Sequence, residues 1–328
     1  MQRNLTIDYL RFFGITLIIL AHVEPPEMLF NFRCFDVCLM LFVSGLAYSG
    51  RKADFSAGFF LHRITRLIIP VYLFLTCYFL CVAIMKGIGV DFGIRREHII
   101  GSFLLTEGIG FVWIIRVFLL IAILTPFLQK MEQCINNTYV LVIVLFAFMF
   151  IIELLIMNNI GLNSDLVHNY VYYATGYSVP FVLGLRMGRN TTKTASKVLA
   201  GLLCLFVLCA ISSNTEGRWW LVNNYKYPPR LYYVTYGSLM SVLLLLLLSS
   251  KRQLVGYSLP MFIARNTIWI YLWHIPFIQL TGRVFQEWYI RYPIVYICAT
   301  VICYFQVKIV ESLIKKHGEK PFYKYLKG

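Results

Sequence analysis

The stretch IDYLRFFGITLIILAHV, from Ile7 to Val23, combines a membrane-like apolar composition with three ionisable side chains. It is nearly long enough to cross the hydrocarbon core of a bilayer, which takes about 20 residues. It nevertheless carries Asp8, Arg11 and His22. Ionisable side chains inside a membrane segment are costly, and they usually face the protein interior or a polar pathway. The stretch therefore predicts a permanent membrane helix with a functional polar stripe.

The three ionisable residues are expected on one face of this helix. Arg11 and His22 are eleven positions apart, which is about 1100°, or roughly 20° past three full turns. They are separated by about 16 Å along the axis, and Asp8 lies one turn before Arg11 and can pair with it. Two plainer explanations stay open, with Arg11 as an anchor at the inner interface and His22 as a hydrogen-bonded link between helices. Histidine also has the chemistry of a general base at neutral pH.

The composition of the whole chain extends the membrane interpretation. Of its 328 residues, 59% are hydrophobic and only 14% are charged, whereas a soluble domain averages about 25% charged residues. The net charge of +15 is best explained by lysine and arginine in cytoplasmic loops that face anionic lipids, and no stretch resembles a nucleic-acid-binding module. The nine cysteines are scattered singly, which predicts reduced core thiols rather than disulfides or a metal site.

Apolar stretches of membrane-spanning length recur along the chain. They predict an all-α fold, a polytopic membrane helical bundle of about ten transmembrane helices near 7–25, 34–50, 64–86, 109–129, 138–157, 168–187, 196–213, 231–249, 261–281 and 291–312. The predicted inner segments hold roughly twice as many lysines and arginines as the outer ones, which favours both termini inside. Residues 1–328 are predicted to form one membrane-embedded domain, with 313–328 as a short basic cytoplasmic tail.

The second predicted span, within CFDVCLMLFVSGLAYSGR, adds an acid and a pair of small residues. Asp36 lies near the outer start of this span, on the same predicted membrane face as His22, and is a candidate partner for it. A simple interfacial acid or helix cap is the plainer alternative for Asp36. Ser44 and Gly45 interrupt the apolar run and predict close approach of another helix.

Three arginines stand in or beside apolar stretches. LHRITRLIIPVY opens the third span with Arg63 and Arg66, spaced i,i+3, so both are expected to face the same way at the cytoplasmic surface. Ordinary positive-inside charge explains them, and so does a clamp for the phosphates of an anionic ligand, which the forked donors of arginine suit. Arg116 is followed by a long apolar run and is expected to face the bundle interior, in an ion pair or a functional role.

Candidate acceptor-binding residues lie near the predicted outer face. His274, in IARNTIWIYLWHIPF, is expected either as a hydrogen-bonded interfacial histidine or in contact with substrate. The outer segment SSNTEGRWWLVNNYKYPPR is aromatic and basic. Trp219 and Trp220 are expected either in an interfacial aromatic belt or in a platform on which sugar rings stack.

Taken in order, these segments resemble the acyltransferase-3 family of bacterial integral membrane acyltransferases. DYLRFFGITLIILAH resembles the family's opening motif, in which ten residues separate an arginine from a histidine. LMLFVSG resembles its Ser-Gly segment, and RITRLIIPVY resembles its Arg-x-x-Arg-Leu-x-x-Pro segment. VWIIRVFLLIAILTP and NTIWIYLWHIP resemble its tryptophan-led fourth span and its near-terminal Tyr-Leu-x-His segment. The resemblance covers most of the chain.

The resemblance implies an O-acyltransferase, an O-acetyltransferase in particular, of the bacterial cytoplasmic (inner) membrane. Such proteins take an acyl group from cytoplasmic acyl-CoA, usually acetyl-CoA, and give it to a hydroxyl of a cell-surface or exported glycan. The implied partners are acyl-CoA as co-substrate, a glycan or lipid-linked glycan, and membrane lipids, with no nucleic acid and no metal. A larger acyl group stays open. A transporter or flippase for a lipid-linked sugar is the competing class, although the sequence has no obvious internal repeat of the transporter kind.

On this interpretation the catalytic candidates are His22, Arg11, Asp36 and Arg116. His22 acts as general base on the acceptor hydroxyl or, alternatively, carries the acyl group itself. Asp36 or Glu24 would orient the imidazole, and Arg116 would stabilise the developing oxyanion or bind the donor. The Arg-x-x-Arg pair would hold the phosphates of the donor, whose charged nucleotide cannot enter hydrocarbon without a large desolvation cost.

Overall fold

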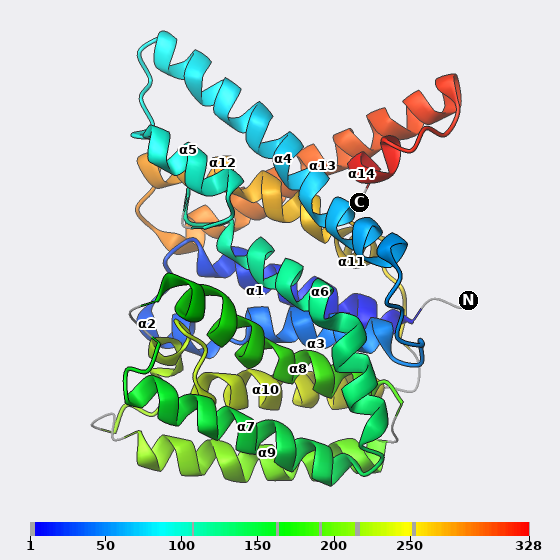
Figure 1. The fold of residues 1–328 in the computed structure, drawn as a ribbon. Coiled ribbons are helices and arrows are strands. Elements are labelled where there is room, and N and C mark those ends of the chain that lie inside the picture. Colours follow the sequence, from blue (N-terminus) through cyan, green and yellow to red (C-terminus); the bar gives the residue numbers. More distant parts are fainter. Residues whose placement is uncertain are drawn as a thin grey trace. The chain divides into compact units, whose positions relative to one another are not determined.

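The computed structural model describes residues 4–327, except for 107, 162–163, 190–191, 214–216, 251–253 and the side chain of Thr192. All the secondary structure of the described residues is helical, without a β-strand, so the predicted all-α fold is confirmed. The chain forms two compact units (Figure 1). Unit 1 consists of Met1–Asp54 and Leu124–Ala264, and unit 2 consists of Phe55–Ile123 and Arg265–Gly328.

Unit 1 is a helical bundle with α3 at its centre. Its elements are α1 (Leu5–Ala21), α2 (Glu27–Phe32), α3 (Asp36–Tyr48), α7 (Thr138–Met157), η1 (Val167–Val171), α8 (Tyr172–Met187), α9 (Thr192–Ser212), η2 (Val222–Tyr225), α10 (Leu231–Ser249), most of α11 (Ser258–Arg265) and the second half of α6 (Trp113–Cys134). Helix α3 packs against α1, α8 and α10, and α10 packs in turn against α9, as Figure 1 shows.

Two glycines allow close packing of α3 against α8 in unit 1. A Cβ atom on Gly45 of α3 would lie 2.0 Å from the main-chain oxygen of Phe181, and one on Gly184 of α8 would lie 2.0 Å from that of Phe42. The two backbones therefore touch where each helix lacks a side chain, which is the usual role of small residues between membrane helices. The close helix approach predicted from Ser44 and Gly45 is confirmed.

Unit 2 contains the two longest helices. Its elements are α4 (Ala57–Gly87), α5 (Arg96–Phe103), the first half of α6, α12 (Thr267–Val284), α13 (Trp288–His317) and α14 (Tyr323–Lys327). Helix α12 packs against both α13 and α4, and α14 packs against the same two helices. Because α4 has 31 residues, it is about 46 Å long, more than the roughly 30 Å of a hydrocarbon core.

Seven helical segments among the described residues are long and apolar enough to cross a membrane. They are Glu27–Tyr48, Ala57–Gly87, Trp113–Cys134, Thr138–Met157, Lys193–Ser212, Leu231–Ser249 and Trp288–His317. Helices α1, α8 and α12 lie at the other predicted spans but have only 17, 16 and 18 residues, fewer than the usual 20 or so. The count of ten spans and the orientation of the chain stay predictions.

The cysteines differ in part from the expected core thiols. None of the described cysteines forms a disulfide. Cys34, Cys38 and Cys303 are buried, but Cys77 and Cys81 lie exposed on α4. The apolar faces of a membrane helix turn toward lipid as readily as toward the core, so an apolar run alone does not indicate burial in the protein.

Candidate active site

Helix α1 carries the first group of predicted site residues. It begins at Asn4, whose Oδ1 accepts hydrogen bonds from the main-chain N–H groups of Thr6 at 3.0 Å and Ile7 at 3.4 Å. One turn later, Arg11 Nη1 lies 3.8 Å from Asp8 Oδ1. The carboxylate is nearly sealed, at 5% side-chain exposure, whereas the guanidinium is 35% exposed. The predicted pairing of Asp8 with Arg11 is therefore present, and it leaves part of the guanidinium exposed.

His22 is the residue on which α1 ends. Its main-chain N–H donates to Ile19 O at 3.1 Å, and its side chain is half-buried. The chain then turns at Glu24, which has a φ of 57°. This left-handed conformation costs a residue with a Cβ on the order of 1 kcal/mol, and Glu24 precedes Pro25, so the helix cannot simply continue. His22 thus lies at a sharply defined helix end, and its role as a base stays a prediction.

Asp36 is held by two cations at the start of α3. Its Oδ2 lies 2.6 Å from Arg33 Nη1, and its Oδ1 lies 3.3 Å from Lys226 Nζ. The main-chain N–H of Val37 also donates to Oδ1, at 2.8 Å. All three charged side chains are nearly sealed from solvent, at 3–4% exposure. Asp36 therefore has an anchoring role, fastening α3 to the segment that leads into α10, and an orienting role toward His22 stays a prediction.

The charge state of Lys226 follows from its neighbours. Burial is the largest single influence and lowers the pKa of this ammonium group, but the Asp36 carboxylate, Tyr227 and Cys34 together raise the pKa above its ordinary value. Arg33 opposes that increase because it is a second cation beside the same carboxylate. The cluster therefore holds two positive charges against one negative charge at neutral pH.

The aromatic residues Trp219 and Trp220 lie in the same unit as this cluster. Trp219 is 45% exposed, and its ring meets those of Trp220 at 6.1 Å and Phe32 at 6.2 Å, both edge to face. The segment that follows these two tryptophans is held to α2, because the main-chain N–H of Asn223 donates to Asn31 Oδ1 at 2.9 Å. The structure therefore presents one indole of the predicted pair openly and keeps Trp220 half-buried.

A second charged cluster joins α6 to α8 in unit 1. Arg186 Nε lies 2.7 Å from Glu132 Oε1, and Arg189 Nη1 lies 3.1 Å from Glu132 Oε2. Arg186 also donates to main-chain carbonyls at the end of α6, among them Glu132 O at 2.6 Å and Asn136 O at 2.7 Å. A helix end leaves such carbonyls without helical partners. Arg186 is therefore a packing residue that ties α8 to the α6–α7 connection.

The predicted donor-binding residues lie on the first turns of α4 in unit 2. Ser56 caps this helix by accepting a hydrogen bond from Phe59 N at 3.2 Å. Arg63 is half-buried, with its guanidinium 5.9 Å from the centre of the Phe59 ring. Arg66 is exposed. The helix thus offers at least one open guanidinium for an anionic ligand.

Arg116 and His274 are both buried in unit 2. Arg116 of α6 is 7% exposed, as its position in an apolar run predicted. His274 of α12 is completely sealed, with Nδ1 against the main-chain oxygen of Tyr271 and its ring 5.8 Å from that of Phe111. Tyr271 in turn donates from its hydroxyl to Phe111 O. His274 is thus part of the packing between α12 and the segment that leads into α6, and contact with substrate stays a prediction.

Sequence reasoning missed the partners of Asp36 and the role of Glu132. Arg33 had a usable signal, because it stands three positions before Asp36 and helical neighbours at this spacing can pair. Lys226 and Arg186 had none beyond being cations next to apolar stretches, where positive charge is common. Among the described residues, no group of three or more His, Cys, Asp or Glu side chains is placed to hold a metal ion.

Comparison with known families identifies the family to which the chain belongs. The model of the acyltransferase-3 family, described as an acyltransferase domain, matches residues 4–305. Because the match covers nearly the whole chain and spans both units, the chain belongs to this family. It is a multi-pass membrane acyltransferase. No curated protein matches the sequence, and no solved structure does.

Proposed function

We propose that the protein transfers an acyl group, acetyl in the simplest case, from acyl-CoA at the cytoplasmic face of a bacterial inner membrane to a hydroxyl of a glycan or lipid-linked glycan. Family membership supports acyl transfer. The observation that supports the proposed donor, acceptor and base is the arrangement of residues on α1. This helix bears the Asp8–Arg11 pair in its first turns and a half-buried His22 at its end. One helix with a cation and a base about 16 Å apart suits a donor and an acceptor that arrive from opposite membrane faces.

In the proposed step, His22 removes the proton of the acceptor hydroxyl while the hydroxyl oxygen attacks the thioester carbonyl carbon. The tetrahedral intermediate then collapses and the carbon–sulfur bond breaks. The leaving thiolate of coenzyme A takes up the proton from His22, so the products are an O-acyl glycan and free coenzyme A. Arg116 is proposed to stabilise the oxyanion, because a buried guanidinium acts strongly on charge that develops in a low-dielectric interior.

The remaining candidates are proposed to bind and position the substrates. Arg66, and Arg63 beside it, would hold the donor phosphates by charge-assisted hydrogen bonds. The exposed ring of Trp219 is the best-placed surface for a sugar of the acceptor. Asp36 is proposed as a positioning residue, because its two ion pairs fix the helix that packs against α1.

The decisive experiment measures acyl transfer by purified protein in nanodiscs, with radiolabelled acetyl-CoA and a panel of candidate glycans. We expect the wild-type protein to label a glycan and His22→Ala to lose at least about 100-fold of the rate, the usual minimum for a general base. The matched control is His168→Ala, which removes another half-buried histidine that no proposed step uses. Its transfer rate should stay close to that of the wild-type protein.

Full transfer by His22→Ala at equal protein level would exclude His22 from the chemistry. Wild-type protein that binds no acetyl-CoA, but moves a lipid-linked sugar across a vesicle membrane, would replace the acyltransferase proposal with transport. Replacing acetyl-CoA by longer acyl-CoA donors in the same assay measures the preference for the acyl group.

A further inference from the structure

The segment after α13 folds back onto unit 2. The indole Nε1 of Trp269 donates to Tyr325 O at 2.9 Å, and Gln306 Nε2 donates to Leu326 O at 2.8 Å. Gln306 is itself fixed, because its Oε1 accepts from Trp273 Nε1 at 2.7 Å. Side chains of α12 and α13 thus hold the main-chain carbonyls of α14. The basic tail predicted for residues 313–328 begins inside α13 and ends in this docked helix, rather than as an extended segment.

The docked helix lies beside the predicted donor-binding residues. The hydroxyl of Tyr325 lies 3.5 Å from Thr65 Oγ1, and α14 packs against α4. Thr65 directly precedes Arg66, and Lys324 directly precedes Tyr325. Because neighbouring residues of a helix point about 100° apart, Arg66 lies on the flank of α4 next to this contact, whereas Arg63 points about 200° away from Thr65.

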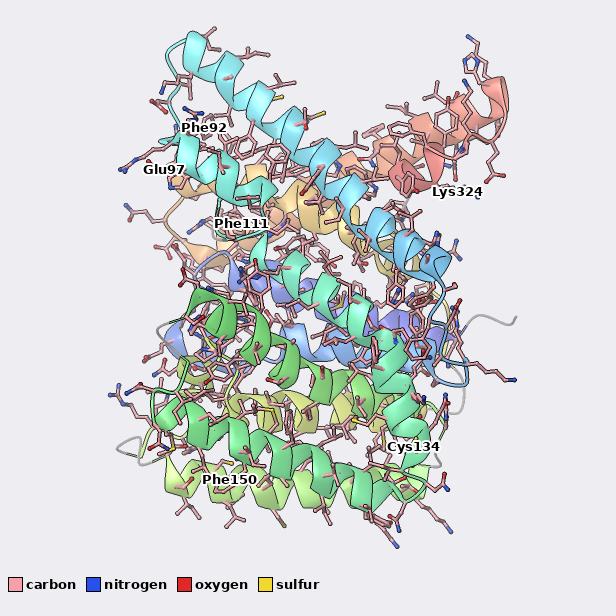
Figure 2. All side chains as sticks on the ribbon, viewed as in Figure 1. Phe92, Glu97, Phe111, Cys134, Phe150 and Lys324 are labelled. Atoms are coloured by element: carbon pink, nitrogen blue, oxygen red, sulfur yellow. The ribbon has the colours of Figure 1, made fainter. Side chains whose placement is uncertain are left out.

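One lysine of α14 is available to a ligand. Lys327 Nζ lies 3.6 Å from Glu311 Oε1, and Lys308 Nζ lies 3.4 Å from Glu311 Oε2. The Glu311 carboxylate therefore forms ion pairs with both lysines. Lys324 is exposed, and no carboxylate within the part of the chain that the structure describes is paired with it. Figure 2 labels Lys324 on α14. A docked helix therefore holds a lysine without a carboxylate partner, and its Tyr325 contacts Thr65, the residue before the exposed Arg66.

We infer that Lys324 binds a phosphate of the acyl donor beside Arg66, so that the segment after α13 forms part of the donor site. This inference rests on the proposed acyl-CoA-dependent function. Coenzyme A carries a pyrophosphate and a 3′-phosphate, and one phosphomonoester alone has about −1.5 to −2 charges at neutral pH. The pyrophosphate adds further negative charge, so the donor as a whole carries more negative charge than the two arginines of α4 can neutralise. Lysine, a flexible point charge with three donors, is well suited to add to such a site.

Helix α14 lies outside the region that matches the family model. The family match ends at residue 305, whereas α14 begins at Tyr323. Lys324 therefore lies beyond the matched residues, whereas the Arg-x-x-Arg segment lies within them. The expected consequence is a change in donor affinity with little change in the chemical step.

The test measures the Kd of radiolabelled acetyl-CoA for the full chain in nanodiscs of phosphatidylcholine, which has no net charge. We expect Lys324→Gln to weaken binding about five- to tenfold, the effect of one charge-assisted phosphate contact, and to leave the rate at saturating donor within about twofold. Lys324→Arg keeps the charge and should keep most of the affinity. The matched control is Lys197→Gln, which removes an exposed lysine of α9 in unit 1.

A second donor, acetyl-dephospho-CoA, identifies the phosphate. If Lys324 binds the 3′-phosphate, Lys324→Gln will have no effect on this donor; if it binds the pyrophosphate, the loss will persist. Equal Kd values for wild-type protein and Lys324→Gln would overturn the inference. So would a loss that occurs only in nanodiscs with anionic phosphatidylglycerol, since Lys324 would then bind lipid headgroups. Wild-type protein that binds no acetyl-CoA would instead overturn the proposed function itself.

Discussion

Lys226 Nζ lies 3.3 Å from Asp36 Oδ1, although 190 positions separate the two residues in the sequence. Arg33 shares the same carboxylate, and all three side chains are nearly sealed. Breaking a buried pair is costly because it leaves an uncompensated charge. Because the cluster has two cations and one anion, removing the Asp36 carboxylate should lower the stability of the fold far more than removing one of the cations.

Asp36→Asn is therefore expected to destabilise the protein by roughly 3–5 kcal/mol, since it leaves two buried cations without a carboxylate. Lys226→Met should cost only about 1 kcal/mol, because Arg33 still neutralises Asp36 and only the lysine hydrogen bond is lost. Thermal unfolding in detergent micelles, followed by intrinsic fluorescence, compares the two variants. Equal decreases in Tm for Asp36→Asn and Lys226→Met would contradict this prediction, because losing the carboxylate would then be no more destabilising than losing one cation.

The same ion pair predicts a dependence of stability on alkaline pH. The pKa of Lys226 is raised in the folded protein, so folding favours the charged lysine. Its contribution is fully present below the ordinary lysine pKa of about 10.4 and is lost as the pH rises through the higher folded value. We expect the Tm difference between wild-type protein and Lys226→Met to be constant from pH 7 to about 10 and to shrink above that. Because Tyr227 and Cys34 also face Lys226, only the difference between the two proteins is informative. A Tm difference unchanged up to pH 11.5 would contradict the ion pair.

Gly45 provides a steric prediction. In Gly45→Ala the new Cβ would meet the Phe181 carbonyl oxygen, which is main chain and cannot rotate away. We expect a loss of about 3 kcal/mol, at the upper end of overpacking costs. Gly201→Ala is the control, because nothing lies within 4 Å of its Cβ position in α9, and it should stabilise the helix by up to about 1 kcal/mol. Equal Tm values for Gly45→Ala and wild-type protein would mean that the crossing of α3 and α8 is looser than the structure has it.

The arginines of α4 give a kinetic prediction. If the exposed Arg66 binds donor phosphate, Arg66→Gln should raise the KM for acetyl-CoA about tenfold, equivalent to 1.4 kcal/mol, and leave kcat almost unchanged. Arg63→Gln should have the smaller effect on KM, since Arg63 is half-buried beside Phe59. Arg96→Gln, which removes an exposed arginine of α5, serves as control. Equal KM values for Arg66→Gln and Arg96→Gln would count against the phosphate clamp.

The sequence by itself predicted the helical class and several local features. Apolar runs of membrane-spanning length become helices because main-chain groups in such runs must be satisfied internally. The pair of Asp8 and Arg11 follows from helical spacing, and the close approach at Gly45 follows from the size of the residue. The family itself was recognised from the order of short motifs, which needs no folded structure.

Only the tertiary structure decided which residues meet across long stretches of chain. It brings Lys226 to Asp36, Arg186 to Glu132, and Tyr325 to Thr65. Helical periodicity fixes the face on which a residue lies, but not which face of which other helix packs against it. That choice depends on side-chain shape and on where buried charges find partners, and so the ion pairs and the docked α14 appear only once the helices are packed.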